Sequence, residues 1–219
     1  MTAPKPSPLS ATIAAALAAA TALLFPAAAF AQSDNSDHAD GFARHVMGRS
    51  TAKFASNEGN LLFLAAGTLY PFARHGFSDT RDQNRAIRTA DTALTGVALS
   101  ELLKRVAHVK RPDDSTSDSF PSGHATAAFA VANMAARYDR STAPLWYAGA
   151  TLISVSRVRL NRHRWADVGA GALLGIATGE IERRQRRGLV MAPIFGATLG
   201  RNERGADQPA RGVSFTARF

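Results

Sequence analysis

Residues 119–129 read SFPSGHATAAF and place a proline, a serine, a glycine and a histidine directly before a run of alanines. Alanine has the highest helix propensity, so this stretch predicts a helix that begins just after Pro121. The first turn of a helix carries unpaired backbone N–H groups and a partial positive charge, so it can bind an anion. The alternative is an ordinary N-cap, in which Ser122 satisfies an amide and His124 has no chemical role.

The rest of the central sequence also predicts helices. Apolar residues or helix formers recur at helical spacing in four further segments, which are residues 58–72, 84–109, 143–158 and 167–187. Proline residues and polar loops separate these segments, as expected where helices end. The pattern therefore predicts an all-α domain over residues 58–187, a bundle of about five to six helices with the active site at the helix ends.

The last predicted helix has an unusual glycine spacing. Gly171, Gly175 and Gly179 recur at every fourth position, so one face of this helix has almost no side chains. Such a face favours close contact between helices, which in a membrane would indicate dimerisation. The uncharged run, residues 168–179, is too short to span a bilayer, so we expect tight packing inside one bundle.

The two ends of the chain differ from the centre. Residues 11–31 are uncharged and end in Ala-Phe-Ala, so residues 1–31 resemble a bacterial signal peptide and predict a periplasmic location; an uncleaved anchor is the alternative. Residues 32–57 are read as a polar N-terminal segment, a linker that enters the domain. Residues 188–219 form a tail whose alternating end predicts a short β-hairpin, or a strand like those of outer-membrane barrels.

The chain is basic and has no cysteine. Its 26 Lys and Arg residues outnumber 17 Asp and Glu residues, which gives a formal net charge of +9 at pH 7. This charge favours anionic partners, either phosphorylated small molecules or lipid headgroups, with peripheral contact to a membrane surface. Nucleic acid is not expected as a partner, because no basic motif with interleaved aromatic residues is present. Without cysteine, stability must come from a packed core.

Three separate segments carry residues suited to phosphate chemistry. They are Lys104 and Arg111; Ser122, Gly123 and His124; and Arg157, His163 and Asp167. Residues seven or four apart lie on one face of a helix, which would align the first two cations and bring Asp167 to His163. A carboxylate beside Nδ1–H would leave Nε2 of His163 free as a nucleophile. Cations and a helix N-terminus would then bind a tetrahedral dianion.

In their order and spacing, these segments resemble the motifs of the type-2 phosphatidic acid phosphatase family. The pattern of that family is Lys-x6-Arg-Pro, then Pro-Ser-Gly-His, then Ser-Arg-x5-His-x3-Asp, and all three blocks are intact between Lys104 and Asp167. This family shares a helical core with the bacterial class A acid phosphatases and the vanadium haloperoxidases. The chain departs from the lipid-phosphatase branch in one respect, because it has no series of long apolar segments.

The resemblance implies a role for each candidate residue. His163 would attack phosphorus to form a phosphohistidine, Asp167 would orient it, and His124 would protonate the leaving group. The phosphate-binding residues would be Lys104, Arg111, Ser122, Gly123 and Arg157. No metal and no cofactor would be needed. The implied function is a periplasmic phosphatase for phosphomonoesters, including lipid phosphates or isoprenoid diphosphates; the alternatives are a vanadate-dependent haloperoxidase and a non-enzymatic envelope protein that docks through its C-terminal strand.

Overall fold

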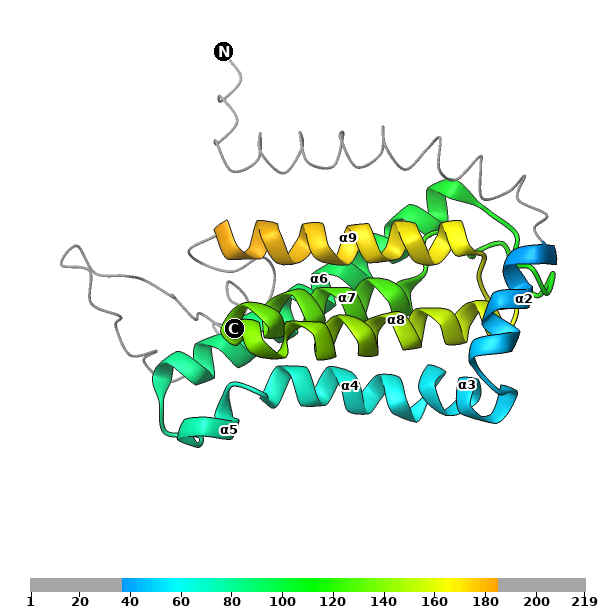
Figure 1. Cartoon of the computed structure of the whole chain (residues 1–219). Coiled ribbons are helices and arrows are strands. Elements are labelled where there is room, and N and C mark those ends of the chain that lie inside the picture. Colours follow the sequence, from blue (N-terminus) through cyan, green and yellow to red (C-terminus); the bar gives the residue numbers. More distant parts are fainter. Residues whose placement is uncertain (1–36, 185–219) are drawn as a thin grey trace, which may run out of the picture.

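Helix α7 (Gly123–Tyr138), which follows the quoted proline, lies at the centre of the computed structural model, whose described part is residues 37–184 (Figure 1). It contacts α4 (Glu58–Leu69), α6 (Thr80–Ala107), α8 (Ala143–Arg159) and α9 (Trp165–Arg184). Most α7 residues are buried, and many of them are alanines. Small side chains let the neighbouring helices approach closely, so the all-α bundle is built around this helix.

The five long helices confirm the helical segments expected from the sequence, with small changes at their ends. Helix α6 begins four residues earlier than the expected 84–109, because the Asp79 side chain accepts a hydrogen bond from Arg81 N at 2.8 Å and caps the first turn. Two short elements were not expected: α5 (Phe72–His75) and the 3₁₀ turn Arg140–Thr142. The segments expected to form a signal peptide and a C-terminal hairpin lie outside the described residues.

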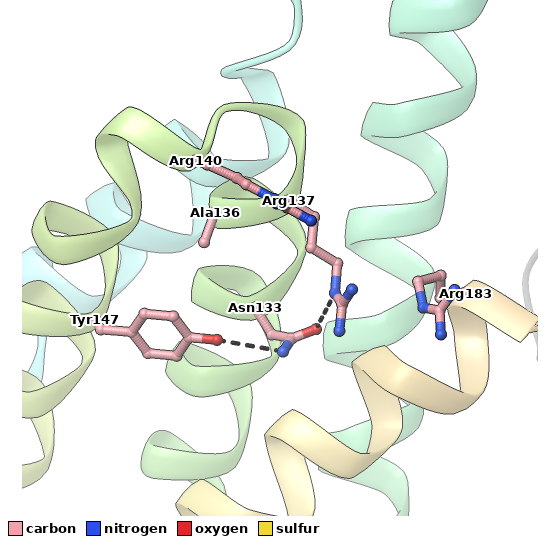
Figure 2. Close-up of a pocket in the computed structure, with 6 residues that line it drawn as sticks. All are labelled: Asn133, Ala136, Arg137, Arg140, Tyr147 and Arg183. Atoms are coloured by element: carbon pink, nitrogen blue, oxygen red, sulfur yellow. Dashed lines mark hydrogen bonds between the residues drawn. The ribbon is translucent and has the colours of Figure 1, made fainter.

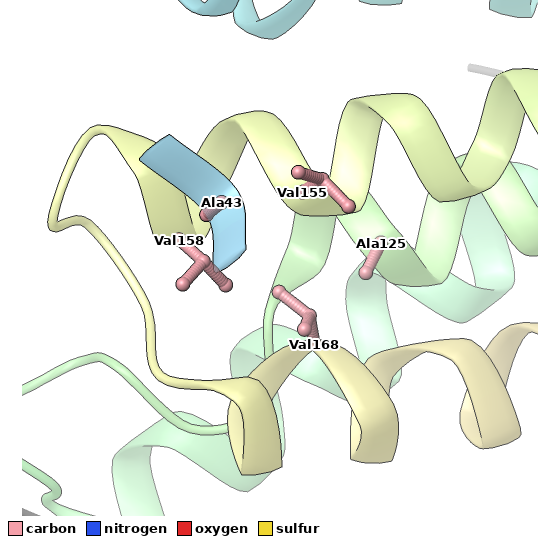
Figure 3. Close-up of a cluster of buried hydrophobic side chains, with 5 residues drawn as sticks. All are labelled: Ala43, Ala125, Val155, Val158 and Val168. Atoms are coloured by element: carbon pink, nitrogen blue, oxygen red, sulfur yellow. The ribbon is translucent and has the colours of Figure 1, made fainter. Parts of the chain in front are cut away.

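The segment expected to be a polar linker is helical where it is described. It forms α2 (Asp37–Val46) and α3 (Arg49–Ser56), so the helical domain begins well before residue 58. Both helices pack against α8. Ala43 of α2 joins a buried cluster with side chains of α7, α8 and α9, which are Ala125, Val155, Val158 and Val168 (Figure 3). A contact made by one small alanine side chain gives no strong hydrophobic pattern in the sequence.

Close packing of α9 on α7 uses the glycine face. A Cβ atom added to Gly171 would lie 2.5 Å from Ser122 O, and one added to Gly175 would lie 2.3 Å from Thr126 O. Both distances are far shorter than van der Waals contact, so neither position accepts a side chain without movement of the backbone. This agrees with the packing expected from the glycine spacing. Among residues 37–184, no helix combines the length and hydropathy needed to cross a membrane.

A pair of glycine substitutions in α9 tests this packing. Gly175→Ala should lower the free energy of unfolding by about 1–3 kcal/mol, because the new methyl group would overlap the α7 backbone. Gly169→Ala is the matched control, since its Cβ would meet nothing within 4 Å. That control should raise stability by about 0.5–1 kcal/mol through helix propensity alone. Urea unfolding followed by circular dichroism measures both; equal effects of the two variants would contradict close packing.

Candidate active site

The three motif segments meet at one end of the bundle, where α6 and α8 end and α7 and α9 begin (Figure 1). The starts of α7 and α9 are tied together, because Ser122 N donates a hydrogen bond to Asp167 O at 3.0 Å. Lys104 lies in the last turn of α6 and Arg157 in the last turn of α8. Cations at these positions are stabilised by the negative ends of their helices.

The N-terminus of α7 is the first part of the site. Ser122 is its N-cap, and its side chain accepts a long hydrogen bond from Ala125 N at 3.5 Å. A Cβ atom added to Gly123 would lie 3.6 Å from Lys104 Nζ, so this lysine reaches the first turn of the helix. Lys104 and Gly123, two of the candidate phosphate-binding residues, therefore lie side by side in the structure.

His163 lies in the loop before α9 and is 2% exposed. Its Nδ1 atom is 2.8 Å from the backbone oxygen of Ser119. A carbonyl oxygen can only accept a hydrogen bond, so Nδ1 must carry a proton. In the neutral ring Nε2 then has a free lone pair, and burial keeps the ring neutral by lowering its pKa. This is the protonation state that a nucleophilic imidazole requires.

The position of Asp167 differs from the one that the sequence predicts. Its Oδ2 atom is 3.7 Å from His163 Nδ1, which is beyond hydrogen-bond distance. That oxygen instead accepts hydrogen bonds from Ser119 Oγ at 2.5 Å and from Arg164 N at 2.8 Å. The Ser119 carbonyl thus takes the place expected for the carboxylate. Asp167 contributes a buried negative charge near the ring and fixes the loop that carries it.

Arg157 is a buried cation, with 8% of its surface exposed. Burial, together with the nearby charges of Arg111 and Arg162, lowers its pKa to about 10. Among the described residues its guanidinium forms no ion pair with a carboxylate, and its buried Nε atom has no hydrogen-bond partner. A buried guanidinium of this kind is well suited to bind an oxyanion.

The two more exposed cations have carboxylate partners. Arg111 donates two hydrogen bonds to Asp118, from Nε at 2.9 Å and from Nη2 at 3.0 Å. Lys104 Nζ lies 2.6 Å from Glu101 Oε1. Burial alone would raise the pKa of Asp118, but the hydrogen bonds from Arg111 and Thr116 lower it to about 2. Asp118 is therefore ionised at any physiological pH and would compete with an anion that approached Arg111.

His124, in the first turn of α7, faces the same group of charges. Burial lowers its pKa most strongly, and electrostatic interactions with Arg157, His163 and Lys104 lower it further, to about 4. A hydrogen bond to the backbone of Ser56 acts in the opposite direction. His124 is thus neutral near pH 7 in the free protein, and a bound dianion would favour its protonated form.

The structure brings all eight candidate residues to one end of the bundle. Four further residues contact them and were not singled out from the sequence: Ser56, Glu101, Asp118 and Ser119. Ser119 stands three residues before Ser122, and Glu101 precedes Lys104 by one helical turn, so proximity to the motifs could have suggested both. Nothing in the sequence connects Ser56 to the site. Residues 37–184 contain no group of three or more His, Asp or Glu side chains placed to hold a metal ion.

A pocket elsewhere in the bundle does not contain these residues. It lies at the other end of α7 (Figure 2) and is lined by Asn133, Ala136, Arg137, Arg140, Tyr147 and Arg183. Asn133 is ten residues beyond Gly123, which is about 15 Å along a helix. Arg137 and Arg183 both pair with Glu180. Among the described residues, no histidine, serine or carboxylate lines this pocket, so we place the candidate site at the opposite end of the helix.

Comparison with known proteins identifies a related family. Residues 87–189 match the model of the PAP2 superfamily. This confirms the resemblance based on the three motifs. A lipid A 1-phosphatase of Porphyromonas gingivalis is 43% identical in an alignment of 76 residues that covers 32% of this chain. The chain spans only 17% of the length of that relative. No solved structure shows significant similarity to the chain.

The Arg111–Asp118 pair predicts the effect of removing one carboxylate. Asp118→Asn should bind inorganic phosphate about two- to fivefold more tightly, because the competing negative charge is lost from a half-exposed ion pair. Calorimetric titration with phosphate measures the change. Asp114→Asn is the matched control, because this substitution removes the same formal charge. Asp114 is exposed, and its φ of 54° is one that asparagine tolerates. Equal affinities in the two variants would contradict competition at Arg111.

Proposed function

We propose that the chain is a phosphatase that hydrolyses phosphomonoesters through a phosphohistidine intermediate on His163. The observation that carries this proposal is the hydrogen bond from His163 Nδ1 to the Ser119 carbonyl. It leaves Nε2 unprotonated beside a group of cations and a helix N-terminus. The match of residues 87–189 to the PAP2 superfamily supports the same chemistry.

In the first step the Nε2 lone pair of His163 attacks phosphorus, and the bond from phosphorus to the ester oxygen breaks. Arg157, Arg111 and Lys104 offset the charge on the phosphoryl oxygens, together with the backbone N–H groups at the start of α7. The ring becomes positively charged when Nε2 is phosphorylated. The nearby carboxylate of Asp167 stabilises that charge without taking the proton.

His124 completes the reaction by moving one proton in each direction. Its protonated form donates to the leaving alkoxide, and the neutral ring then accepts a proton from the water that attacks phosphorus. The P–N bond breaks, which releases inorganic phosphate and restores neutral His163. Because the pKa of His124 is about 4 in the free protein, the charge of the bound substrate must supply the stabilisation that keeps it protonated.

We further propose that lipid phosphates are among the substrates and that the protein reaches them from the membrane surface. Exposed apolar side chains lie on the helices that border the site, at Phe42, Val46, Phe54 and Val106. The basic character of the chain would favour an anionic surface. The matched relative is itself a lipid A 1-phosphatase. Export to the periplasm, expected from residues 1–31, would place the enzyme beside such lipids.

Substitution of the nucleophile provides the direct test of the mechanism. His163→Ala should lower turnover by at least about 1,000-fold, because the substitution removes the group that forms the covalent intermediate. Wild type should also yield a trapped phosphoprotein that is labile in acid and stable in base. The assay compares an aryl phosphate, phosphatidate and undecaprenyl diphosphate, which also identifies the preferred ester.

The control for this experiment is His108→Asn. His108 is exposed and has a φ of 48°, a conformation that asparagine accepts. The His108→Asn variant should therefore retain wild-type activity. If the His163→Ala variant folds and hydrolyses the same esters at the normal rate, the phosphohistidine mechanism is wrong.

The pKa of His124 predicts coupling between anion binding and proton uptake. Sulfate stays a dianion above about pH 3, so any proton that is taken up on binding goes to the protein and not to the ligand. Above a pH of about 4 the free protein holds His124 neutral, and sulfate should draw a proton onto it. Sulfate affinity should therefore fall with rising pH, by at most tenfold per unit. Calorimetry at pH 6 in buffers of different ionisation enthalpy counts the protons, and His124→Asn should abolish the uptake. Proton-independent binding by wild type would contradict the assignment.

A further inference from the structure

The end of α3 lies in the candidate active site, although α3 is outside the residues that match the PAP2 superfamily. Ser56, the last residue of α3, is 1% exposed. The α2–α3 segment is held against the end of α8, because Arg159 Nε donates a hydrogen bond to Met47 O at 3.0 Å. Packing of Ala43 in the cluster of Figure 3 supports the same placement.

The side chain of Ser56 contacts the most buried cation of the site. Arg157 Nη1 donates a short hydrogen bond to Ser56 Oγ. A hydroxyl oxygen orients a guanidinium without neutralising its charge, whereas a carboxylate would offset the charge, as Asp118 does at Arg111. The full positive charge of Arg157 therefore remains for a phosphoryl group, and its Nε has no competing partner among the described residues.

The backbone of Ser56 contacts the second histidine of the site. Its carbonyl is one of the last four in α3, which have no hydrogen-bond donor within the helix. The His124 ring hydrogen-bonds to this backbone, which raises the pKa of His124 against the stronger effects of burial and of nearby cations. A ring held through one nitrogen in this way would keep its other nitrogen free to exchange a proton with the substrate.

We propose that Ser56 is a positioning residue of this phosphatase site, with its hydroxyl aligning Arg157 and its carbonyl aligning His124. The proposal rests on the proposed function, because it assigns Ser56 to the site where that reaction occurs. It makes the α2–α3 segment part of the catalytic unit. Ser56 does not itself contact the reacting atoms, so its effect must pass through the two residues that it holds.

Sulfate binding tests the role of the hydroxyl without any need for turnover. Ser56→Ala should weaken sulfate binding about tenfold, because Arg157 loses the hydrogen bond that orients it. Ser56→Thr keeps a hydroxyl and should restore most of the affinity. Ser154→Ala is the matched control, since Ser154 is also buried but its Oγ has no hydrogen-bond partner. That control should bind sulfate as wild type does.

A double-mutant cycle separates positioning from a general effect on folding. In an Arg157→Ala background, the further change Ser56→Ala should leave sulfate affinity unaltered, because its effect acts through the missing guanidinium. Proton uptake on binding should persist in Ser56→Ala, since alanine retains the carbonyl that holds His124. Wild-type affinity in Ser56→Ala, or the same loss in both backgrounds, would overturn the proposal.

The same measurements distinguish this proposal from the proposed function. If Ser56→Ala weakens sulfate binding as described but wild type hydrolyses no phosphate ester, the phosphatase assignment fails and the positioning of Arg157 stands. If wild type is an active phosphatase and Ser56→Ala matches it in sulfate affinity and in kcat/KM, the role of Ser56 is refuted while the phosphatase assignment stands.

Discussion

The close approach of α9 to α7 is the contact on which the geometry of the site depends. Gly171 lets the α9 backbone lie against the Ser122 carbonyl, and Ser122 N donates a hydrogen bond to Asp167 O. These contacts join the start of α7 to the start of the helix that follows His163. A larger side chain at Gly171 would separate the two starts and move His163, the proposed nucleophile, away from the backbone amides of α7. Packing and chemistry are therefore set by the same few backbone atoms.

The site is also shaped by how its positive charges are balanced. Lys104 and Arg111, which lie nearer to solvent, have carboxylate partners, whereas the deeper Arg157 contacts the neutral hydroxyl of Ser56 and pairs with no carboxylate within residues 37–184. Repulsion and burial lower the pKa values of Arg157 and His124 together. A bound dianion would offset the repulsion and the loss of solvation for both groups at once. In the proposed reaction, the charge of the substrate would thus both strengthen its binding and protonate His124 for its role as an acid.

Much of the bundle could be predicted because its helices have long, distinctive patterns. The five main helices and the meeting of all eight candidate residues follow from alanine-rich segments, proline boundaries and motif spacing. The partner of His163 Nδ1 could not be predicted in the same way. Asp167 is four residues away and Ser119 forty-four, so local spacing favours the carboxylate, whereas the path of the loop delivers the carbonyl. Tertiary structure therefore determines which oxygen accepts the hydrogen bond from His163 Nδ1.

The α2–α3 segment shows a second limit of sequence patterns. Its buried contacts come from small residues such as Ala43, Ala52 and Ser56, which carry little hydrophobic signal in a segment rich in charge. Yet the segment contributes both to the core and to the environment of Arg157 and His124. A motif therefore defines the reacting groups, while residues outside it adjust their orientation and pKa. Proteins with identical motifs can then differ in phosphate affinity and pH dependence through a segment that no motif includes.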